Sequence, residues 1–378
     1  MRRLLITTII MAQLICSCTT NGDTSSVIDL DKNDKVSIFD LVDSISVVQL
    51  ETTHESLFKR AKDIIFHKNR YYLFDWELQA FFCFDSKGKF LYKLNKRGRG
   101  ADEYDFVGDF NINKYNDQLM LVVPWGTILY YDLDGNFISK VKLPGDLRAY
   151  NEIYALDNDH LLFITWSHEY KAYTYSRSSG KILKGSIPTT EELCGVFPPF
   201  GLSYYYKDSL YFNNAGVKNQ VINMSDPNPR VSYSWDFGDK NYTEKQINKA
   251  ILYKQKMRQE RKPSLLRKDM LGDSSFPNYY VLRNFETNRF RGLFLTYKIP
   301  DDLLYVFKDK NDGKDIVFRE TIEGVDFSSY WICDNAIISV SNKDNSTCNK
   351  VLSSEQLKIV ESQDPDNDNP FLVIYHLK

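Results

Sequence analysis

The chain has 378 residues, 14% of them aromatic, and its 48 basic and 50 acidic residues give a formal charge of −2. This balance excludes the strongly basic footprint of a nucleic-acid-binding protein. No stretch is apolar over the roughly 18 to 20 residues that a bilayer-spanning helix needs, so the sequence predicts no transmembrane segment.

The N-terminus is typical of an export signal. Two arginines precede a twelve-residue, mostly apolar run, LLITTIIMAQLI, which ends at the sequence CSC. This order predicts a signal peptide over residues 1–17. The cysteine after a small residue resembles the lipobox of bacterial lipoproteins, which implies lipidation of Cys18 and an anchor in the cell envelope, in the outer membrane. The alternative is an ordinary secretory signal with Cys18 as a free thiol; residues 18–35 are expected to form a tether.

From residue 36 the chain repeats one pattern about every 45 residues: four short β-strands separated by polar turns. The first two copies, 64–94 and 109–143, match element for element, CFDSKGKFL in one answering YYDLDGNFI in the other. Glycines 88, 135 and 180 occupy the same turn and lie 47 and 45 residues apart. Weaker copies cover 152–183, 202–237 and 279–321.

The last copy is incomplete. Residues 329–342 supply two strands, a helix-like stretch follows over 350–362, and 370–378 supply a third strand. The β-patterned segment 44–53 near the N-terminus can provide the fourth. This arrangement predicts an all-β fold over 36–378, a six-bladed β-propeller of four-stranded blades whose ring is closed by an N-terminal strand.

The stretch KRGRGADEYDF links the first and second blades. Gly98 and Gly100 permit a compact turn, and Glu103 and Tyr104 are expected to fix it through backbone amides of the neighbouring blade. The stretch is neither a GxGxxG nor a P-loop motif, so phosphate binding has little support. A structural turn is the main interpretation, and a ligand-facing loop at the channel mouth is the alternative.

With ETTHESLF near the start and NPFLVIYHLK at the end, this crossover resembles the six-bladed β-propeller lipoproteins of Bacteroidetes. The resemblance covers about residues 28–378. It implies the fold and an envelope location but no activity, because none is established for that family. The chain departs from the family's usual GRGPGEY at Ala101 and Asp102, which weakens the expectation of a tight turn there.

Residues 240–272 interrupt the repeat between the fourth and fifth blades. The segment holds ten basic and three acidic residues, and Thr243 with Gln246 forms a capping box that predicts a helix. One interpretation is that the apolar side packs on the propeller. The other is an arm that recruits an anionic glycan, a protein or lipid headgroups. The candidate patch comprises Lys254, Lys256, Arg258, Arg261 and Lys262.

Few residues have the spacing of a catalytic or metal site. His168 with Glu169 is the most suggestive pair; a surface loop between strands is the main interpretation, and a metal ligand is the alternative. DPDNDNP over 364–370 has alternating oxygen ligands but lacks the glycine and glutamate of an EF-hand, so no cofactor is expected, with weak calcium binding as the alternative. Four cysteines remain after the signal, as core residues or with one disulfide, Cys333 and Cys348 being the nearest pair.

These features favour a non-catalytic, membrane-anchored propeller that binds a glycan, peptide or protein partner and no nucleic acid. The alternative is a metal-dependent hydrolase or lactonase-like propeller, in which acidic residues of the innermost strands would hold a central metal. The innermost positions are not convincingly acidic across the blades, which counts against the enzyme. A purely structural subunit is the third hypothesis.

Overall fold

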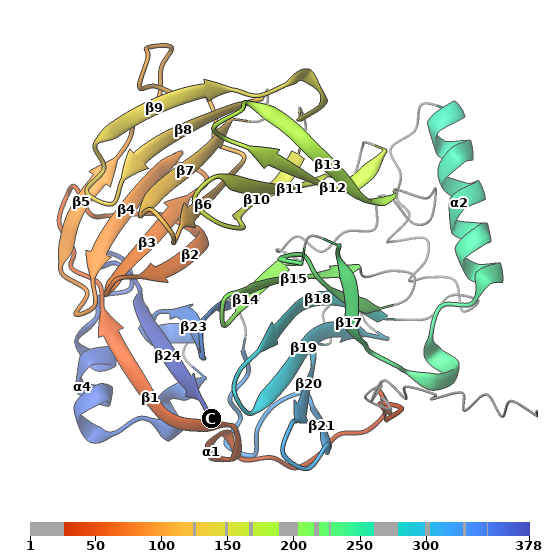
Figure 1. Cartoon of the computed structure of the whole chain (residues 1–378). Helices are drawn as coiled ribbons and strands as arrows, with labels where there is room; N and C mark the ends of the chain where they lie inside the picture. The colour runs from red at the N-terminus through yellow and green to blue at the C-terminus, as the bar shows by residue number, and fades with distance from the viewer. Residues whose placement is uncertain are drawn as a thin grey trace, which may run out of the picture.

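The computed structural model describes residues 26–378 except 124–125, 148–149, 166–168, 189–202, 215–218, 227, 261–278, 299–302, 328–329 and 346. Six sheets of four antiparallel strands follow one another around a ring (Figure 1). The predicted six-bladed β-propeller is confirmed.

Within each of blades 1 to 5 the strands run outward from the channel in chain order. Blades 1 and 2 comprise β2 (Ala61–His67), β3 (Arg70–Asp75), β4 (Ala80–Asp85), β5 (Phe90–Leu94), β6 (Asp109–Asn113), β7 (Gln118–Val123), β8 (Thr127–Asp132) and β9 (Phe137–Lys142). Blades 3 and 4 comprise β10 (Tyr150–Ala155), β11 (His160–Thr165), β12 (Tyr170–Ser176), β13 (Lys181–Pro188), β14 (Ser203–Tyr206), β15 (Ser209–Asn214), β16 (Gln220–Asn223) and β17 (Arg230–Ser234). Blade 5 comprises β18 (Tyr279–Glu286), β19 (Phe290–Tyr297), β20 (Leu303–Asp309) and β21 (Asp315–Phe318).

The ring closes in blade 6, which combines both ends of the chain. Its strands are β22 (Tyr330–Cys333), β23 (Ala336–Ser341), β24 (Phe371–Leu377) and, outermost, β1 (Val42–Gln49). Strand β1 pairs antiparallel with β24, with Val47 opposite Val373. The short helix α1 (Ile38–Leu41) precedes β1, and α4 (Ser354–Ser362), capped by Ser353, packs beside it.

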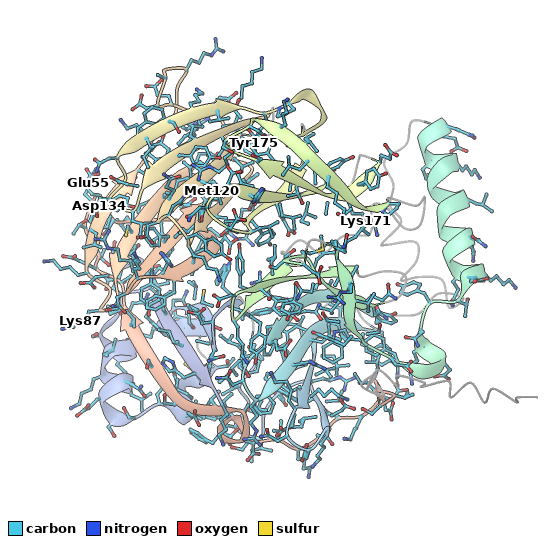
Figure 2. All side chains as sticks on the ribbon, viewed as in Figure 1. Glu55, Lys87, Met120, Asp134, Lys171 and Tyr175 are labelled. Carbon is cyan, nitrogen blue, oxygen red and sulfur yellow. The ribbon has the colours of Figure 1, made fainter. Side chains whose placement is uncertain are left out.

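The hydrophobic core lies between blades rather than at one centre. The two middle strands of a blade are covered on both faces. Met120 of blade 2 and Tyr175 of blade 3 are buried in one cluster, whereas Lys87 and Glu55 project outward (Figure 2). Between blades 6 and 1, Ile64 and Phe82 pack in one cluster with Trp331. The outer turns need glycine because Gly88 and Gly135 both have φ of +82°, which L side chains rarely adopt.

The basic insertion forms α2 (Glu244–Gln259), which stands outside the ring on the side of blades 3 to 5 (Figure 1). Its predicted capping box is present. The Thr243 amide donates to Gln246 Oε1 at 2.8 Å, and the Gln246 amide donates to Thr243 Oγ1 at 3.3 Å. Leu252 is 66% exposed. Within the described part of the chain, no helix is both long and apolar enough to span a bilayer.

Cys83, Cys333 and Cys348 are not joined in a disulfide, so the alternative of a bridge between Cys333 and Cys348 is wrong. Burial raises the pKa of both Cys83 and Cys333 to about 12, which keeps these thiols protonated and unreactive at neutral pH. Cys194 lies outside the described residues.

Candidate functional site

Charged side chains occupy the same position on four of the innermost strands. Asp63, Asp109, Glu152 and Arg283 lie opposite Phe74, Val122, Ile164 and Phe294 of the adjoining second strands. In blades 1, 3 and 5 this residue follows a β-bulge, which changes the direction of the side chains that come after it. The innermost strands are therefore more acidic than the sequence analysis concluded, because bulges shift the register that was read from the sequence.

The carboxylates of these innermost strands form hydrogen bonds within the propeller. Asp109 Oδ2 accepts a hydrogen bond from the Ile153 amide at 3.0 Å, and Asn111 donates to the Ile153 carbonyl at 2.8 Å, which ties β6 to β10. The Tyr154 hydroxyl donates to Glu152 at 2.8 Å. Lys62, the bulge residue of blade 1, donates to the Gly108 carbonyl at 2.8 Å.

Burial raises the pKa of Asp109 well above its usual value, and the nearby carboxylate of Glu152 raises it further, while Lys62 acts in the opposite direction. Burial likewise raises the pKa of Asp63, against the effect of Arg283. These groups interact electrostatically, yet among the described residues no three His, Cys, Asp or Glu side chains gather closely enough to hold a metal ion.

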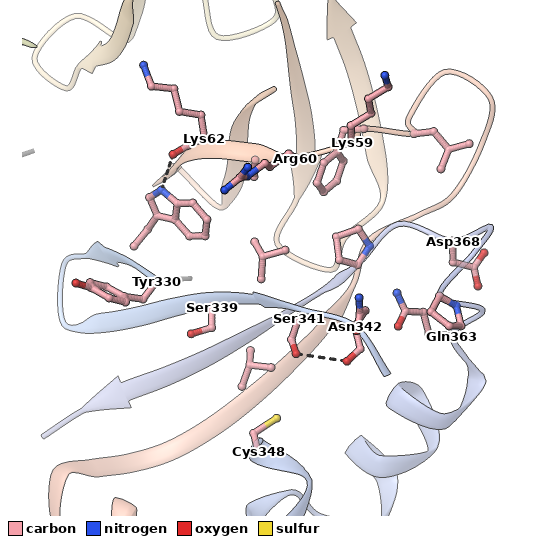
Figure 3. A pocket seen from close by; sticks show the side chains of 18 of the residues that line it. Lys59, Arg60, Lys62, Tyr330, Ser339, Ser341, Asn342, Cys348, Gln363 and Asp368 are labelled. Atoms are coloured by element: carbon pink, nitrogen blue, oxygen red, sulfur yellow. Dashed lines mark hydrogen bonds between the residues drawn. The ribbon is translucent and has the colours of Figure 1, made fainter. Parts of the chain in front are cut away.

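A pocket of about 790 Å³ opens between blades 1 and 6 (Figure 3). One wall is the segment 57–62 that leads into β2, together with Trp76 and Glu77 of the β3–β4 turn. The other wall consists of the blade 6 strands and the loops over 341–348 and 363–370. The Trp331 indole donates to the Lys62 carbonyl at 3.3 Å, so the two walls are joined at the inner end.

The blade 1 wall is basic. Lys59, Arg60 and Lys62 all line the pocket; the Arg60 guanidinium projects towards its middle, whereas the ammonium groups of Lys59 and Lys62 point away from blade 6 (Figure 3). Lys59 lies 3.8 Å from Glu77, whereas Arg60 forms no ion pair with any carboxylate of the described residues. A guanidinium in this setting can bind a carboxylate, sulfate or phosphate through two parallel hydrogen bonds.

An aromatic surface adjoins the basic wall. Trp76 is 40% exposed, its ring packs edge to face on Phe106 at 4.7 Å, and the Lys62 ammonium lies 4.1 Å from its centroid. Tyr330 and Trp331 line the pocket from blade 6. An exposed indole held in a fixed orientation offers a flat apolar face at the mouth of a polar pocket.

The blade 6 wall is polar and contains hydroxyl and amide groups. Ser339 is 7% exposed, and its buried hydroxyl has no hydrogen-bond partner among the described residues. Ser341, Asn342 and Gln363 lie along the same wall (Figure 3). Gln363 is fixed by the Lys343 amide at 2.7 Å and the Asn369 carbonyl at 3.0 Å.

The acidic turn that was considered for calcium forms the rim of this pocket. Asp366 and Asp368 belong to the lining, and Asp364 accepts bonds from the Asp366 amide at 3.1 Å and from Asn367 at 2.8 Å. The Asp368 carboxylate accepts from the Asp364 amide at 2.9 Å. These oxygens therefore stabilise the turn before β24, and they place negative charge opposite the basic wall.

The crossover between blades 1 and 2 is held by its own side chains. Glu103 accepts from the Gly100 amide at 2.7 Å, and a Cβ on Gly98 would lie 2.0 Å from the Glu103 carboxylate. Tyr104 is buried and donates to the Gln79 carbonyl at 2.8 Å. The expected bonds to amides of the neighbouring blade are therefore wrong, since Glu103 acts within the crossover and Tyr104 on blade 1.

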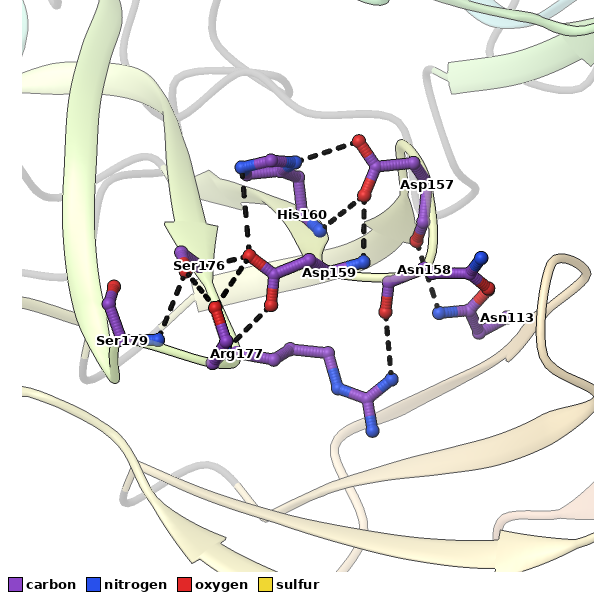
Figure 4. A network of polar contacts seen from close by, with 9 residues as sticks. Asn113, Asp157, Asn158, Asp159, His160, Ser176, Arg177 and Ser179 are labelled. Atoms are coloured by element: carbon purple, nitrogen blue, oxygen red, sulfur yellow. Dashed lines mark hydrogen bonds and ion pairs between the residues drawn. The ribbon is translucent and has the colours of Figure 1, made fainter.

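A second polar network surrounds His160, the first residue of β11, and the turn that precedes it (Figure 4). His160 Nδ1 lies 2.7 Å from Asp157, but the Ser176 hydroxyl donates to Asp159 at 2.8 Å rather than to the histidine. Arg177 donates to the Asn158 carbonyl at 3.2 Å. Because no serine of the described residues bonds to the His160 ring, the network stabilises the turn and lacks the geometry of a nucleophile and its base.

The remaining predicted site residues are not brought to the pocket. Lys256 is exposed on α2 and lies 4.0 Å from Glu260, and positions 254 and 258 are on the same helix. Cys18, His168, Arg261 and Lys262 lie outside the described residues. The pocket residues themselves were missed, although the exposed WELQ turn after a buried strand was a readable signal.

Comparison with solved structures supports the fold. A Bacteroides fragilis protein described as a "putative exported protein" is similar over 92% of this chain and 98% of its own, with a TM-score of 0.74 at 14% identity. A member of the DUF4221 family from Bacteroides vulgatus is similar over 92% and 99%, with a TM-score of 0.53 at 10% identity. No curated protein matched the chain. The model of DUF4934, a domain of unknown function, matches residues 25–376, and the chain belongs to that family.

Proposed function

We propose that this protein is an exported envelope lipoprotein, anchored at Cys18, whose propeller binds an acidic oligosaccharide in the pocket between blades 1 and 6 and releases it unchanged. The signal-like N-terminus and the similarity to a Bacteroides protein described as exported support the location. The observation that carries the binding proposal is the composition of the pocket: a basic wall, an exposed indole and a hydroxyl- and amide-lined wall in one cavity.

Each part of the pocket matches one chemical feature of such a ligand. The C–H face of a sugar ring is apolar and can stack on Trp76, while the hydroxyls need short donors and acceptors such as Ser341 and Asn342 of the lining. The acidic group is expected at Arg60, because the carboxylates of the lining lie mainly on the opposite wall. A volume of about 790 Å³ is within the range of sites that enclose a small ligand.

A thermal-shift screen of neutral, uronate-containing and sulfated oligosaccharides, and of acidic peptides, tests the proposal, because a ligand of the native state raises the melting temperature. We expect the acidic oligosaccharides to give the largest shift. Trp76→Ala should weaken their binding about three- to tenfold through loss of stacking. Phe137→Ala, which truncates a similarly exposed ring on β9, is the matched control and should bind like the wild type.

A response to peptides alone, or equal binding by wild type and Trp76→Ala, would contradict the proposal. Chromatography of the recovered ligand tests the absence of chemistry: an intact oligosaccharide is expected, and chelator-sensitive cleavage would instead support the metal-dependent hydrolase.

A further inference from the structure

The first described residues of the chain are fixed beside the base of α2. The Ile28 amide donates to the Asp236 carbonyl at 2.8 Å, and Lys240, four residues before the helix, lies 3.0 Å from Asp31. Tyr297 and Lys298 also bind Asp31. In Figure 1 this red segment lies at the lower end of the helix. The path from the N-terminus into the propeller therefore starts next to α2.

Helix α2 presents a basic stripe to solvent. Lys245, Lys249, Leu252 and Lys256 are all exposed, and their spacing of four, three and four residues places them on one face of the helix. The insertion 240–272 has a net charge of +7. Removing residues 1–17 takes away two arginines and no acid, so the mature chain has a charge of −4 and the part outside the insertion carries −11. The insertion thus carries a net positive charge, whereas the rest of the mature chain is net negative.

We propose that the exposed face of α2 lies on the phosphate-bearing, anionic headgroups of the membrane in which the chain is anchored. This inference rests on the lipid anchor at Cys18 that is part of the proposed function. Ser26 comes eight positions after Cys18, a distance of at most about 28 Å along an extended chain, so the anchor holds α2 close to the bilayer surface. A helix of 16 residues is about 24 Å long and can lie along that surface.

An acyl anchor and a basic cluster strengthen membrane binding together, because each adds its own attraction to the bilayer. Lysines near an anionic surface are attracted within a Debye length, and Leu252, 66% exposed between them, can enter the headgroup region. Blades 1 and 6 lie across the ring from α2 (Figure 1), so this orientation directs the pocket away from the membrane.

Vesicle co-sedimentation of the lipid-free fragment 19–378 tests the inference. The fragment contains every strand of the ring and all residues that make the described contacts. We expect it to bind vesicles of phosphatidylcholine with phosphatidylglycerol, to lose binding as salt rises, and not to bind phosphatidylcholine alone. The triple variant Lys245→Glu, Lys249→Glu, Lys256→Glu should bind the anionic vesicles at least about tenfold more weakly.

The matched control is Lys87→Glu, Lys89→Glu, Lys358→Glu, which reverses three exposed lysines on other surfaces and should bind like the wild type. No binding of the wild type to anionic vesicles, or equal loss in both triple variants, would overturn the inference. Unchanged melting temperatures would show that both variants fold. The anchor is tested separately by metabolic labelling of the full chain with palmitate, since Cys18→Ser should abolish the label, and the vesicle assay is independent of the anchor because its fragment lacks Cys18.

Discussion

The position of the Glu103 side chain explains why the crossover contains glycine at positions 98 and 100. Neither Gly98 nor Gly100 has a positive φ, so neither is needed for a left-handed backbone. The Glu103 carboxylate instead occupies the space where a side chain on Gly98 would lie, 2.0 Å from the ideal Cβ position. Close approach, rather than turn geometry, therefore explains the glycine.

Gly98→Ala should accordingly lower the free energy of unfolding by about 1 to 3 kcal/mol, because the added methyl displaces Glu103 from the Gly100 amide. Chemical denaturation measures the change. In a Glu103→Ala background the same substitution should cost less. Gly145→Ala is the control, since no atom lies within 4 Å of its Cβ position; equal losses at both glycines would contradict this account.

The raised pKa of Asp109 predicts an unusual dependence of the protein's stability on pH. Its pKa in the folded protein is raised by burial and by Glu152, so the folded state holds a proton that the unfolded state releases as pH rises. Stability should therefore fall as pH rises above the unfolded value of about 4. Asp109→Asn should raise the melting temperature at pH 7 and match the wild type below about pH 4.

Asp117 provides the opposite case for the same experiment. Lys68 and His67 lower its pKa, so its contribution is present above the unfolded pKa and is lost as pH falls. Asp117→Asn should thus lower the melting temperature at pH 7 and converge with the wild type in acid. A destabilising effect of Asp109→Asn at neutral pH would show that the channel carboxylate is charged and satisfied.

Strand β1 is the element on which ring closure depends. It pairs along β24 from Val42 to Gln49, although more than 320 residues separate the two strands. Without it, β24 would present an open edge and blade 6 would have three strands. The terminal strand thus couples the stability of the ring to the segment that follows the tether.

A chain beginning at Leu50 should lose the cooperative thermal transition of the chain beginning at Ser26. Adding a synthetic peptide of residues 36–50 in trans should restore it, because the peptide supplies α1 and β1 together. Circular dichroism during heating gives the readout, and a scrambled peptide is the control. A shortened chain that melts at the same temperature alone would disprove the closing role of β1.

The repeat made the blades readable from the sequence, because the strand and turn pattern is local and recurs about every 45 residues. The pocket was not readable, since its walls come from 57–62 and 330–375 and meet only after the ring closes. The charged residues of the innermost strands were also missed, because the β-bulges at Lys62 and at the equivalent position of blade 3 move Asp63 and Glu152 out of simple alternation.

The whole molecule separates two charged surfaces. The basic helix α2 lies outside blades 3 to 5, next to the path of the tether, while the pocket lies between blades 1 and 6 across the ring (Figure 1). A rigid ring between them would keep a ligand site at a fixed distance from the membrane. Under the proposed function, each charged region would have a distinct role, α2 at the membrane and the pocket at the ligand.

A calorimetric titration of Arg60→Gln tests whether the blade 1 wall binds the acidic group of a saccharide. With the acidic oligosaccharide that gives the largest thermal shift, we expect Arg60→Gln to raise the Kd about ten- to hundredfold, because a charge-assisted pair is lost. Arg230→Gln, whose side chain is 78% exposed on blade 4, should bind like the wild type. An unchanged Kd for Arg60→Gln would contradict the account.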